Sequence, residues 1–223
     1  GKERPIKIEL QNFLKESGDT PGTRKTFIYN TFEKLMKAIS KSLKKNDPNH
    51  LNLGIRYGYI EQLDDELLRI SKESFDALSF NCYALSPDHE KMNHALEISG
   101  LPMIIGEYHF GTVDRGLAQS LWQVNSQKER GDAFRYYTEN AFAHRGLIGT
   151  GWFRWIDQNI NGRTDGENYN CGFIDVTDRP YPYMVDAAIE TAKSLYEIHS
   201  GTKTPFHQAP NAVGHSPIPD LWE

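Results

Sequence analysis

Glu107 is the residue whose type and position most clearly suggest chemistry. It ends the segment LPMIIGE (101–107), which is apolar, β-branched in its middle and has Gly106 just before the glutamate. This pattern predicts a buried strand that ends in a carboxylate. A carboxylate at the end of a strand could act as a nucleophile and form a covalent intermediate. The alternative is a structural ion pair, with Arg56 as the candidate partner.

Polar and aromatic residues follow each of the other apolar segments in the same way. They are Arg56 and Tyr57, Asn81 and Tyr83, Glu107 to His109, and Trp152 to Gln158. Active sites of parallel α/β folds lie at the carboxyl ends of the strands. The spacing therefore predicts that these residues gather at one edge of a sheet.

The elements that must position these residues alternate along the chain. Strands are predicted at 51–56, 76–83, 101–107 and 147–155, and helices at 24–45, 64–74, 87–98, 126–144 and 182–199. The first helix is predicted to be amphipathic, with one apolar face of Phe32, Leu35, Met36, Ile39 and Leu43. Gly100 is the expected C-cap of the helix at 87–98. Strands that alternate with helices predict a parallel sheet.

Composition argues against several classes of protein. The 25 Lys and Arg and 30 Asp and Glu residues give a net charge of −5. This charge gives no electrostatic reason to expect a nucleic-acid partner. No apolar run approaches the length of a membrane span, and the first residues contain no signal-peptide core. Cys82 and Cys171 have no short spacing between them, so neither a zinc site nor a disulfide framework is indicated.

Four stretches of the sequence resemble a known family. They are DPNHLNLGIRYG (47–58), DALSFNCY (76–83), LPMIIGEYHFG (101–111) and the long GTGWFRWIDQNINGRTDGENYNCGFIDVTDRPYP (149–182). Together they resemble the last four strands of the clan A glycoside hydrolases, above all the family-50 β-agarases, with the β-galactosidases of related barrels more distant. The resemblance covers most of residues 24–199. It implies an α/β fold, the C-terminal half of a (β/α)₈ TIM barrel with strands 5–8, over 1–200, followed by an extended tail over 201–223.

The resemblance implies roles for the residues at the strand ends. In the family, the glutamate that ends the seventh strand is the nucleophile, which is Glu107 here, and a tyrosine from the sixth strand holds it, which is Tyr83 by position. Arg56 is a candidate for contacts to sugar or carboxylate, and Asn81 shares the face of Tyr83 on a strand. His109 could bond a sugar hydroxyl, although a structural role is an equal alternative.

The last predicted strand offers two tryptophans as platforms for a sugar ring. In clan A, a tryptophan at this strand end lies under the sugar at the cleaved bond. Trp152 is the position that matches, and Trp155 has the opposite parity, so both cannot face the barrel axis on a regular strand. In the family a polar loop follows this strand, and Asp157, Gln158, Glu167 and Asn168 match it here. Hydroxyl binding is implied for these residues, and loop shaping by Asp and Asn is the competing interpretation.

One expected residue is missing from the pattern. A retaining glycosidase needs a second carboxylic acid about 5 to 5.5 Å from the nucleophile. In clan A this acid comes from an Asn-Glu pair after the fourth strand, and no such pair follows a predicted strand here. The opening residues resemble the agarase segment just past that pair. We therefore expect the general acid/base on an N-terminal half of the same barrel, and we expect this chain alone to be inactive.

The resemblance implies a retaining glycoside hydrolase that acts on a β-galactosidic polysaccharide or oligosaccharide, agarose-like first. No metal or organic cofactor is implied, because the reaction needs only two carboxylates. A β-galactosidase or β-mannosidase type of substrate, a non-catalytic carbohydrate-binding barrel and an independent half barrel remain alternatives. Polysaccharides are extracellular, so a secreted or periplasmic location is expected although no signal is visible.

Overall fold

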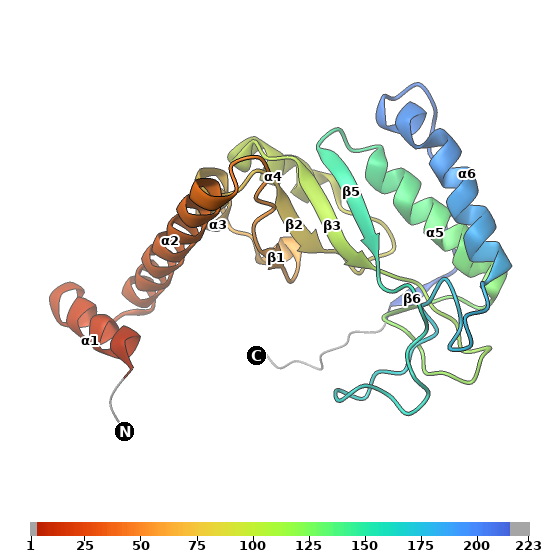
Figure 1. The fold of residues 1–223 in the computed structure, drawn as a ribbon, viewed down its shortest axis with the longest axis horizontal. Helices are drawn as coiled ribbons and strands as arrows, with labels where there is room; N and C mark the ends of the chain where they lie inside the picture. Colours follow the sequence, from red (N-terminus) through yellow and green to blue (C-terminus); the bar gives the residue numbers. More distant parts are fainter. Residues whose placement is uncertain (1–3, 215–223) are drawn as a thin grey trace.

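The computed structural model describes residues 4–214, and its centre is a parallel sheet (Figure 1). Within these residues the sheet has the strand order β1 (Arg56–Tyr57), β2 (Leu78–Asn81), β3 (Met103–Tyr108) and β5 (Leu147–Trp152), all parallel. Between the strands run α3 (Asp65–Ser74), α4 (His89–Ser99) and α5 (Gln127–Phe142), and α6 (Pro182–His199) follows β5 and packs on α5. The predicted alternation and the parallel sheet are confirmed.

The two faces of this sheet differ in burial. The residues that point toward the helices are fully buried in the main core, namely Leu78, Phe80, Met103, Ile105 and Leu147. Alternate residues point to the other face, where Ile148 is 53% exposed and Ile104 is only partly buried. Parallel sheets are ordinarily covered on both faces. This sheet is therefore covered on one face by the described helices and open on the other.

Local sequence signals explain where the helices begin and end. The side chains of Asp64, Asp88 and Ser126 accept backbone N–H bonds and cap α3, α4 and α5. Gly100 ends α4 with a φ of 67°, the left-handed conformation that glycine adopts at little cost. The prediction of a C-cap at Gly100 is thus confirmed. Among the helices of residues 4–214, none has the length and apolarity that crossing a membrane requires.

The first strand is shorter than predicted. The sequence predicts a strand over 51–56, whereas β1 contains only Arg56 and Tyr57. Its described ladder partner is β2 alone, and Leu51, Leu53 and Ile55 before it are exposed. A segment at the sheet edge with no neighbour on its other side has few ladder hydrogen bonds to extend it.

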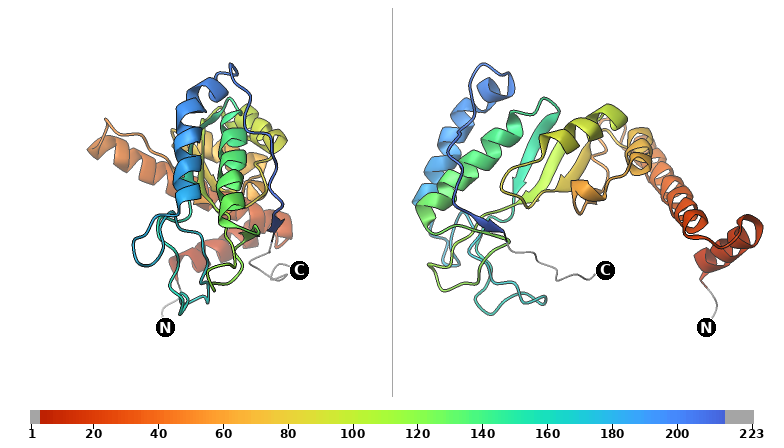
Figure 2. Two further views of the ribbon diagram at one scale, coloured as in Figure 1. Left: turned by 90° about the vertical axis from the view of Figure 1, so that its right-hand side faces the viewer. Right: turned by 180° about the vertical axis from the view of Figure 1, so that it is seen from behind.

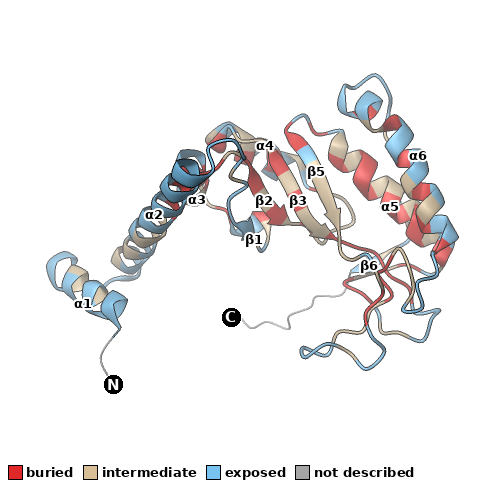
Figure 3. Ribbon diagram, viewed as in Figure 1, coloured by how far each residue is buried: buried red, intermediate tan, exposed pale blue. Residues whose placement is uncertain are grey.

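Two helices extend away from the β1 end of the sheet (Figures 1 and 2). α1 (Pro5–Ser17) is not predicted from the sequence, and α2 (Pro21–Asn46) contains the predicted helix at 24–45. Met36 and Phe32 of α2 pack with a small core at α3. Leu35, Ile39 and Leu43 are exposed, and Figure 3 shows exposure along most of both helices. The predicted helix is thus present, and α3 covers only part of its apolar face.

The tail is joined to the loop that follows β3. The short strands β4 (Trp122–Gln123) and β6 (Val213–Gly214) pair antiparallel, and neither is predicted from the sequence. The expected tail over 201–223 thus contacts the carboxyl-end loops through β6. Its residues 215–223 lie outside the described residues, as do residues 1–3.

Candidate active site

Glu107 lies at the end of β3, where three side chains hold its carboxylate. The guanidinium Nη2 of Arg56 lies 2.8 Å from Oε1. The Tyr83 hydroxyl and the Asn81 amide donate to Oε2 over 2.8 and 3.1 Å. The Glu107 side chain stays 17% exposed. The ion pair with Arg56 is therefore present, and it orients a carboxylate that solvent can still reach.

Neighbouring strands bring these partners together for local reasons. The ladder between β2 and β3 shifts register after Phe80, so that Asn81 lies opposite Glu107. A Cβ atom at Gly106 would lie 2.3 Å from Cδ of Arg56. The absence of a side chain at Gly106 leaves room for the Arg56 side chain to lie against β3 and reach the carboxylate. The Gly-Glu pair of the sequence thus has a steric reason.

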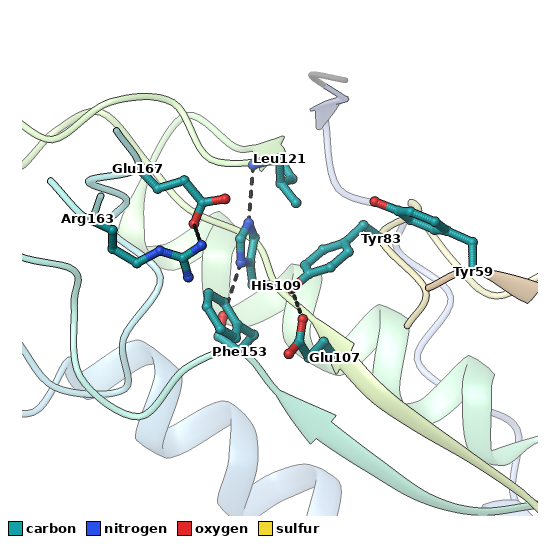
Figure 4. A pocket seen from close by; sticks show the side chains of 8 residues that line it. All are labelled: Tyr59, Tyr83, Glu107, His109, Leu121, Phe153, Arg163 and Glu167. Atoms are coloured by element: carbon teal, nitrogen blue, oxygen red, sulfur yellow. Dashed lines mark hydrogen bonds and ion pairs between the residues drawn. The ribbon is translucent and has the colours of Figure 1, made fainter. Parts of the chain in front are cut away.

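A cavity of about 280 Å³ opens in front of Glu107 (Figure 4). Its lining residues are Tyr59, Tyr83, Glu107, His109, Leu121, Phe153, Arg163 and Glu167. All of them lie at or beyond the carboxyl ends of β1, β2, β3 and β5. The volume is near the lower limit of small-molecule sites, roughly 300 Å³. The predicted gathering of strand-end residues at one edge is thus observed for Glu107, Tyr83, His109 and their neighbours.

Two phenols face the nucleophile candidate across this cavity. Burial and the hydrogen bond to Glu107 raise the pKa of Tyr83 well above its ordinary value. Burial and the charge of Glu107 raise the pKa of Tyr59 as well. Both hydroxyls therefore stay protonated at neutral pH, and Tyr83 acts as a donor to the carboxylate.

His109 lines the cavity but uses both ring nitrogens elsewhere. Its Nε2 accepts from the backbone N–H of Leu121, so the neutral ring carries its proton on Nδ1, which donates to the Phe153 carbonyl; both distances are 3.1 Å. Burial lowers its pKa to about 3, and Arg130 acts in the same direction. In this arrangement neither nitrogen is free for a sugar hydroxyl, in contrast to the bond that the sequence suggests.

Of the aromatic residues at the end of β5, Phe153 is the one that lines the cavity. The Trp152 indole packs against Tyr108, Phe134 and Phe173, and its Nε1 donates to the Cys171 carbonyl over 2.7 Å. Phe153 lines the cavity, whereas Trp152 is absent from its lining. Strand parity does not identify Phe153, because the register between β3 and β5 shifts twice before Trp152.

Trp155 lies outside the cavity lining as well. It is 68% exposed, and one face of its indole stacks on the Phe173 ring at a centroid distance of 5.8 Å. Its ring is thus remote from the contacts that hold Glu107.

The side chain of Asp157 organises the loop after β5. It is 4% exposed and accepts from the Tyr181 hydroxyl, the Gly172 backbone N–H and the Asn170 amide. These bonds favour the loop-shaping interpretation over direct contact with a sugar.

Gln158 and Asn168 also bond to their own part of the chain. Gln158 is fully buried and bridges the Tyr169 backbone and Glu167. Asn168 is partly buried, donates to the Ile160 carbonyl and accepts from the Ala118 backbone N–H. Of the matched polar loop, Glu167 is the residue that lines the cavity.

Three cavity residues besides Phe153 are not candidates in the sequence. Tyr59 follows β1 by two residues, and this short separation from a strand end is the signal that could have identified it. Leu121 and Arg163 come from long loops, where no local pattern indicates which side chains turn inward. Over residues 4–214, no group of three or more His, Cys, Asp or Glu side chains is placed to hold a metal ion.

Comparison with known proteins relates this geometry to one group of enzymes. No protein-family model matches the chain. It is 36% identical over 165 residues to Beta-agarase A of Vibrio sp. (strain JT0107), covering 71% of this chain and 16% of that protein. The solved structure of PfGH50B matches with a TM-score of 0.74 and 34% identity, covering 79% of this chain and 26% of that chain. The agarase AgWH50C matches with a TM-score of 0.74 and 34% identity, covering 80% of this chain and 25% of that chain.

The chain therefore spans about a sixth of the length of the curated relative. The expected resemblance is confirmed in sequence and in fold, and four parallel strands with helices among the described residues fit a segment of an eight-stranded barrel. This chain is a GH50-like chain, related to the β-agarases, and it folds as part of a (β/α)₈ glycoside hydrolase barrel.

Proposed function

We propose that the protein to which this chain belongs is a retaining glycoside hydrolase with Glu107 as its nucleophile. The observation that carries this proposal is the carboxylate of Glu107, fixed by Arg56, Asn81 and Tyr83 at the floor of a cavity at the strand ends. Carboxylates with this placement form covalent glycosyl intermediates in retaining enzymes.

The contacts of Glu107 suit this step. One oxygen, Oε2, accepts from both Tyr83 and Asn81, whereas Oε1 contacts only Arg56 among the described residues. A carboxylate oxygen has two lone pairs, so Oε1 keeps one for attack on the anomeric carbon. The glycosidic oxygen leaves with a proton from a general acid, and water then cleaves the glycosyl–Glu107 ester with that group acting as base. The aromatic ring of Phe153 supplies the apolar wall for the sugar.

The general acid/base comes from another part of the barrel in this proposal. The other carboxylate in the cavity lining, Glu167, is already paired with Arg163 and Gln158, which suits an acceptor better than a proton donor. The open face of the sheet and its exposed Ile148 support a missing set of strands that would complete the barrel. The N-terminal half of the same barrel is the partner that we propose.

The substrate that we propose is an agarose-like β-galactosidic polysaccharide. Support comes from the similarity to Beta-agarase A and to the agarase AgWH50C. A polymer of this size is degraded outside the cytoplasm, so we also propose that the protein is secreted or periplasmic.

The test uses the full-length protein and the substitution Glu107→Gln. Turnover of agarose should fall by several orders of magnitude while oligosaccharide binding persists, because the covalent step is lost but the shape of the side chain is kept. Glu190→Gln, an exposed carboxylate paired with Lys193, is the matched control and should retain full turnover. More than a tenth of wild-type turnover in Glu107→Gln would refute the assignment.

A panel of polysaccharides and aryl glycosides on the wild-type protein separates the alternatives. Hydrolysis of agarose supports the proposed substrate. Hydrolysis only of β-galactosides or β-mannosides would mean that the same catalytic residues act on another substrate. Binding without hydrolysis of any glycoside points to a non-catalytic carbohydrate-binding barrel.

A further inference from the structure

Glu167 presents one occupied and one unoccupied oxygen to the cavity. Its Oε2 lies 3.1 Å from Nη2 of Arg163 and accepts from the Gln158 amide over 2.8 Å. Its Oε1 has no hydrogen-bond partner among residues 4–214, and the side chain is 21% exposed. Figure 4 shows one oxygen bonded to Arg163 and the other turned away, on the side of His109.

The side chain of Glu167 is also held in place before any ligand binds. Gln158 is fully buried, and its own Oε1 accepts the Tyr169 backbone N–H over 2.6 Å. Arg163 is fixed by Asp165, and its backbone N–H donates to the Glu167 carbonyl over 2.8 Å. An acceptor fixed in this way loses little side-chain entropy when it binds a donor.

The charges around the cavity indicate which donor fits. Its two carboxylates, Glu107 and Glu167, are each paired with an arginine, Arg56 and Arg163. No guanidinium in the lining is therefore left unpaired for an anion, and an anionic substituent beside Glu167 would meet like charge. A neutral hydroxyl satisfies Oε1, whereas a sulfate ester or a methyl ether at that position has no proton to donate.

We propose that Oε1 of Glu167 accepts a hydrogen bond from a hydroxyl of the sugar bound against Glu107, and that it selects a free hydroxyl over a sulfated or O-methylated one. This inference rests on the proposed glycosidase function and adds a specificity-determining residue to it. Sites built to bond a substrate hydroxyl discriminate strongly against analogues that lack it, because a polar group is left unpaired.

The experiment compares pairs of substrates on the full-length protein. The probes are agarose oligosaccharides and the same oligosaccharides with O-sulfated or O-methylated galactose units. Wild type should favour the unsubstituted oligosaccharides in kcat/KM. Glu167→Ala should lose roughly 10- to 100-fold in kcat/KM on them, the scale of a hydrogen bond to a charged group. It should lose far less on the sulfated ones, because a sulfated position has no hydroxyl bond to Glu167 that the substitution could remove.

Two further variants keep the result interpretable. Glu167→Gln keeps the size of the side chain and removes its charge. It should reduce the kcat/KM ratio of unsubstituted to substituted oligosaccharides, and it serves as the test if the alanine variant folds poorly. Glu190→Gln removes an exposed carboxylate that pairs with Lys193 and lies outside the cavity lining, and it should leave the kcat/KM ratio of unsubstituted to substituted substrates unchanged.

Equal proportional losses on unsubstituted and substituted substrates in both Glu167 variants would overturn the proposal and leave Glu167 as a loop-shaping residue. Equal hydrolysis of both substrate forms by wild type would overturn it as well. Failure of wild type to cleave agarose, with cleavage of another β-glycoside, would refute only the agarose assignment. The same comparison then runs on substituted and unsubstituted forms of that glycoside.

Discussion

At the scale of single residues, two neighbouring aromatic side chains have different tasks. The Trp152 indole fills space between β3, α5 and the loop after β5, and its N–H is satisfied by the Cys171 carbonyl. Phe153, the next residue, places its ring in the cavity near Glu107. Phe153 thus lines the cavity one residue after the position that the family pattern favours for a sugar platform.

Substitution of the two rings should separate these tasks in the full-length protein. Trp152→Ala should cost roughly 3 kcal/mol of unfolding free energy, as truncation of a packed aromatic does, with little change in KM of the remaining folded enzyme. Phe153→Ala should cost less stability and lower kcat/KM by about 10-fold or more, since roughly 1.5 to 3 kcal/mol follows from burying a phenylalanine.

Denaturant unfolding and steady-state kinetics on both variants check this division. The opposite result, with kinetics impaired by Trp152→Ala and unchanged by Phe153→Ala, would restore Trp152 as the platform.

At the scale of elements, the site is built by loops that are tied to one another. His109, just after β3, bonds both Leu121 in its own loop and Phe153 in the loop after β5. The short β4–β6 ladder holds the same region from the other side. The wall that Phe153 forms in the cavity therefore depends on a neutral, buried histidine.

This dependence predicts acid sensitivity of the fold. The pKa of His109 is lowered to about 3 in the native state by burial, below its ordinary 6.5. The unfolded chain thus binds a proton between these values that the native chain does not, so stability is lost as pH falls from about 6.5 toward 3. The slope is at most about 1.4 kcal/mol per pH unit for one group.

Urea unfolding of wild type and His109→Gln between pH 4 and 7 measures this effect. The variant should be less stable at pH 7 and should lose less stability on acidification. If the free energy of unfolding depends on pH equally in wild type and in His109→Gln, then His109 takes up its proton without unfolding.

At the scale of the whole molecule, the described fold leaves apolar surface uncovered. The open face of the sheet carries Ile148, and α2 carries Leu35, Ile39 and Leu43, all exposed. Strands β1 and β5 each have one neighbour in the described sheet. Uncovered apolar faces and unpaired strand edges of this kind favour association.

Residues 1–223 expressed alone should therefore aggregate or associate, and should hydrolyse no glycoside. Co-expression with the segment that supplies the remaining barrel strands should restore solubility and activity. Replacing Leu35 and Ile39 by lysine should make the isolated chain more soluble and weaken assembly with that segment. Gel filtration measures the association and activity assays measure the hydrolysis. A monomeric, cooperatively folding and active 223-residue protein would contradict the proposal.

Much of this architecture follows from the sequence by itself. Apolar periodicity locates α2 to α6 and the strands of the parallel sheet, because side chains repeat every 3.6 residues in a helix and every two in a strand. Punctuation such as Gly100 fixes an element's end, and the Gly-Glu pair at 106–107 marks the carboxylate at the end of a buried strand. Arg56 was a candidate partner of Glu107 from its position near a strand end, the family resemblance pointed to Tyr83, and the bond from Asn81 emerged only in the structure.

Only the tertiary structure decided which face or side chain is covered and which is free. Periodicity predicts which residues form the apolar face of α2. How many of these residues α3 covers depends on how the two helices pack. In the loops no periodicity applies, so the hydrogen bonds of the folded chain determine that Phe153 and Glu167 turn into the cavity while Trp152, Asp157 and Asn168 do not. Glu167 is held within its own loop by Arg163 and Gln158. Phe153 and Trp152 are bonded to residues far from them in the sequence, His109 and Cys171, and local pattern carries no information about those bonds.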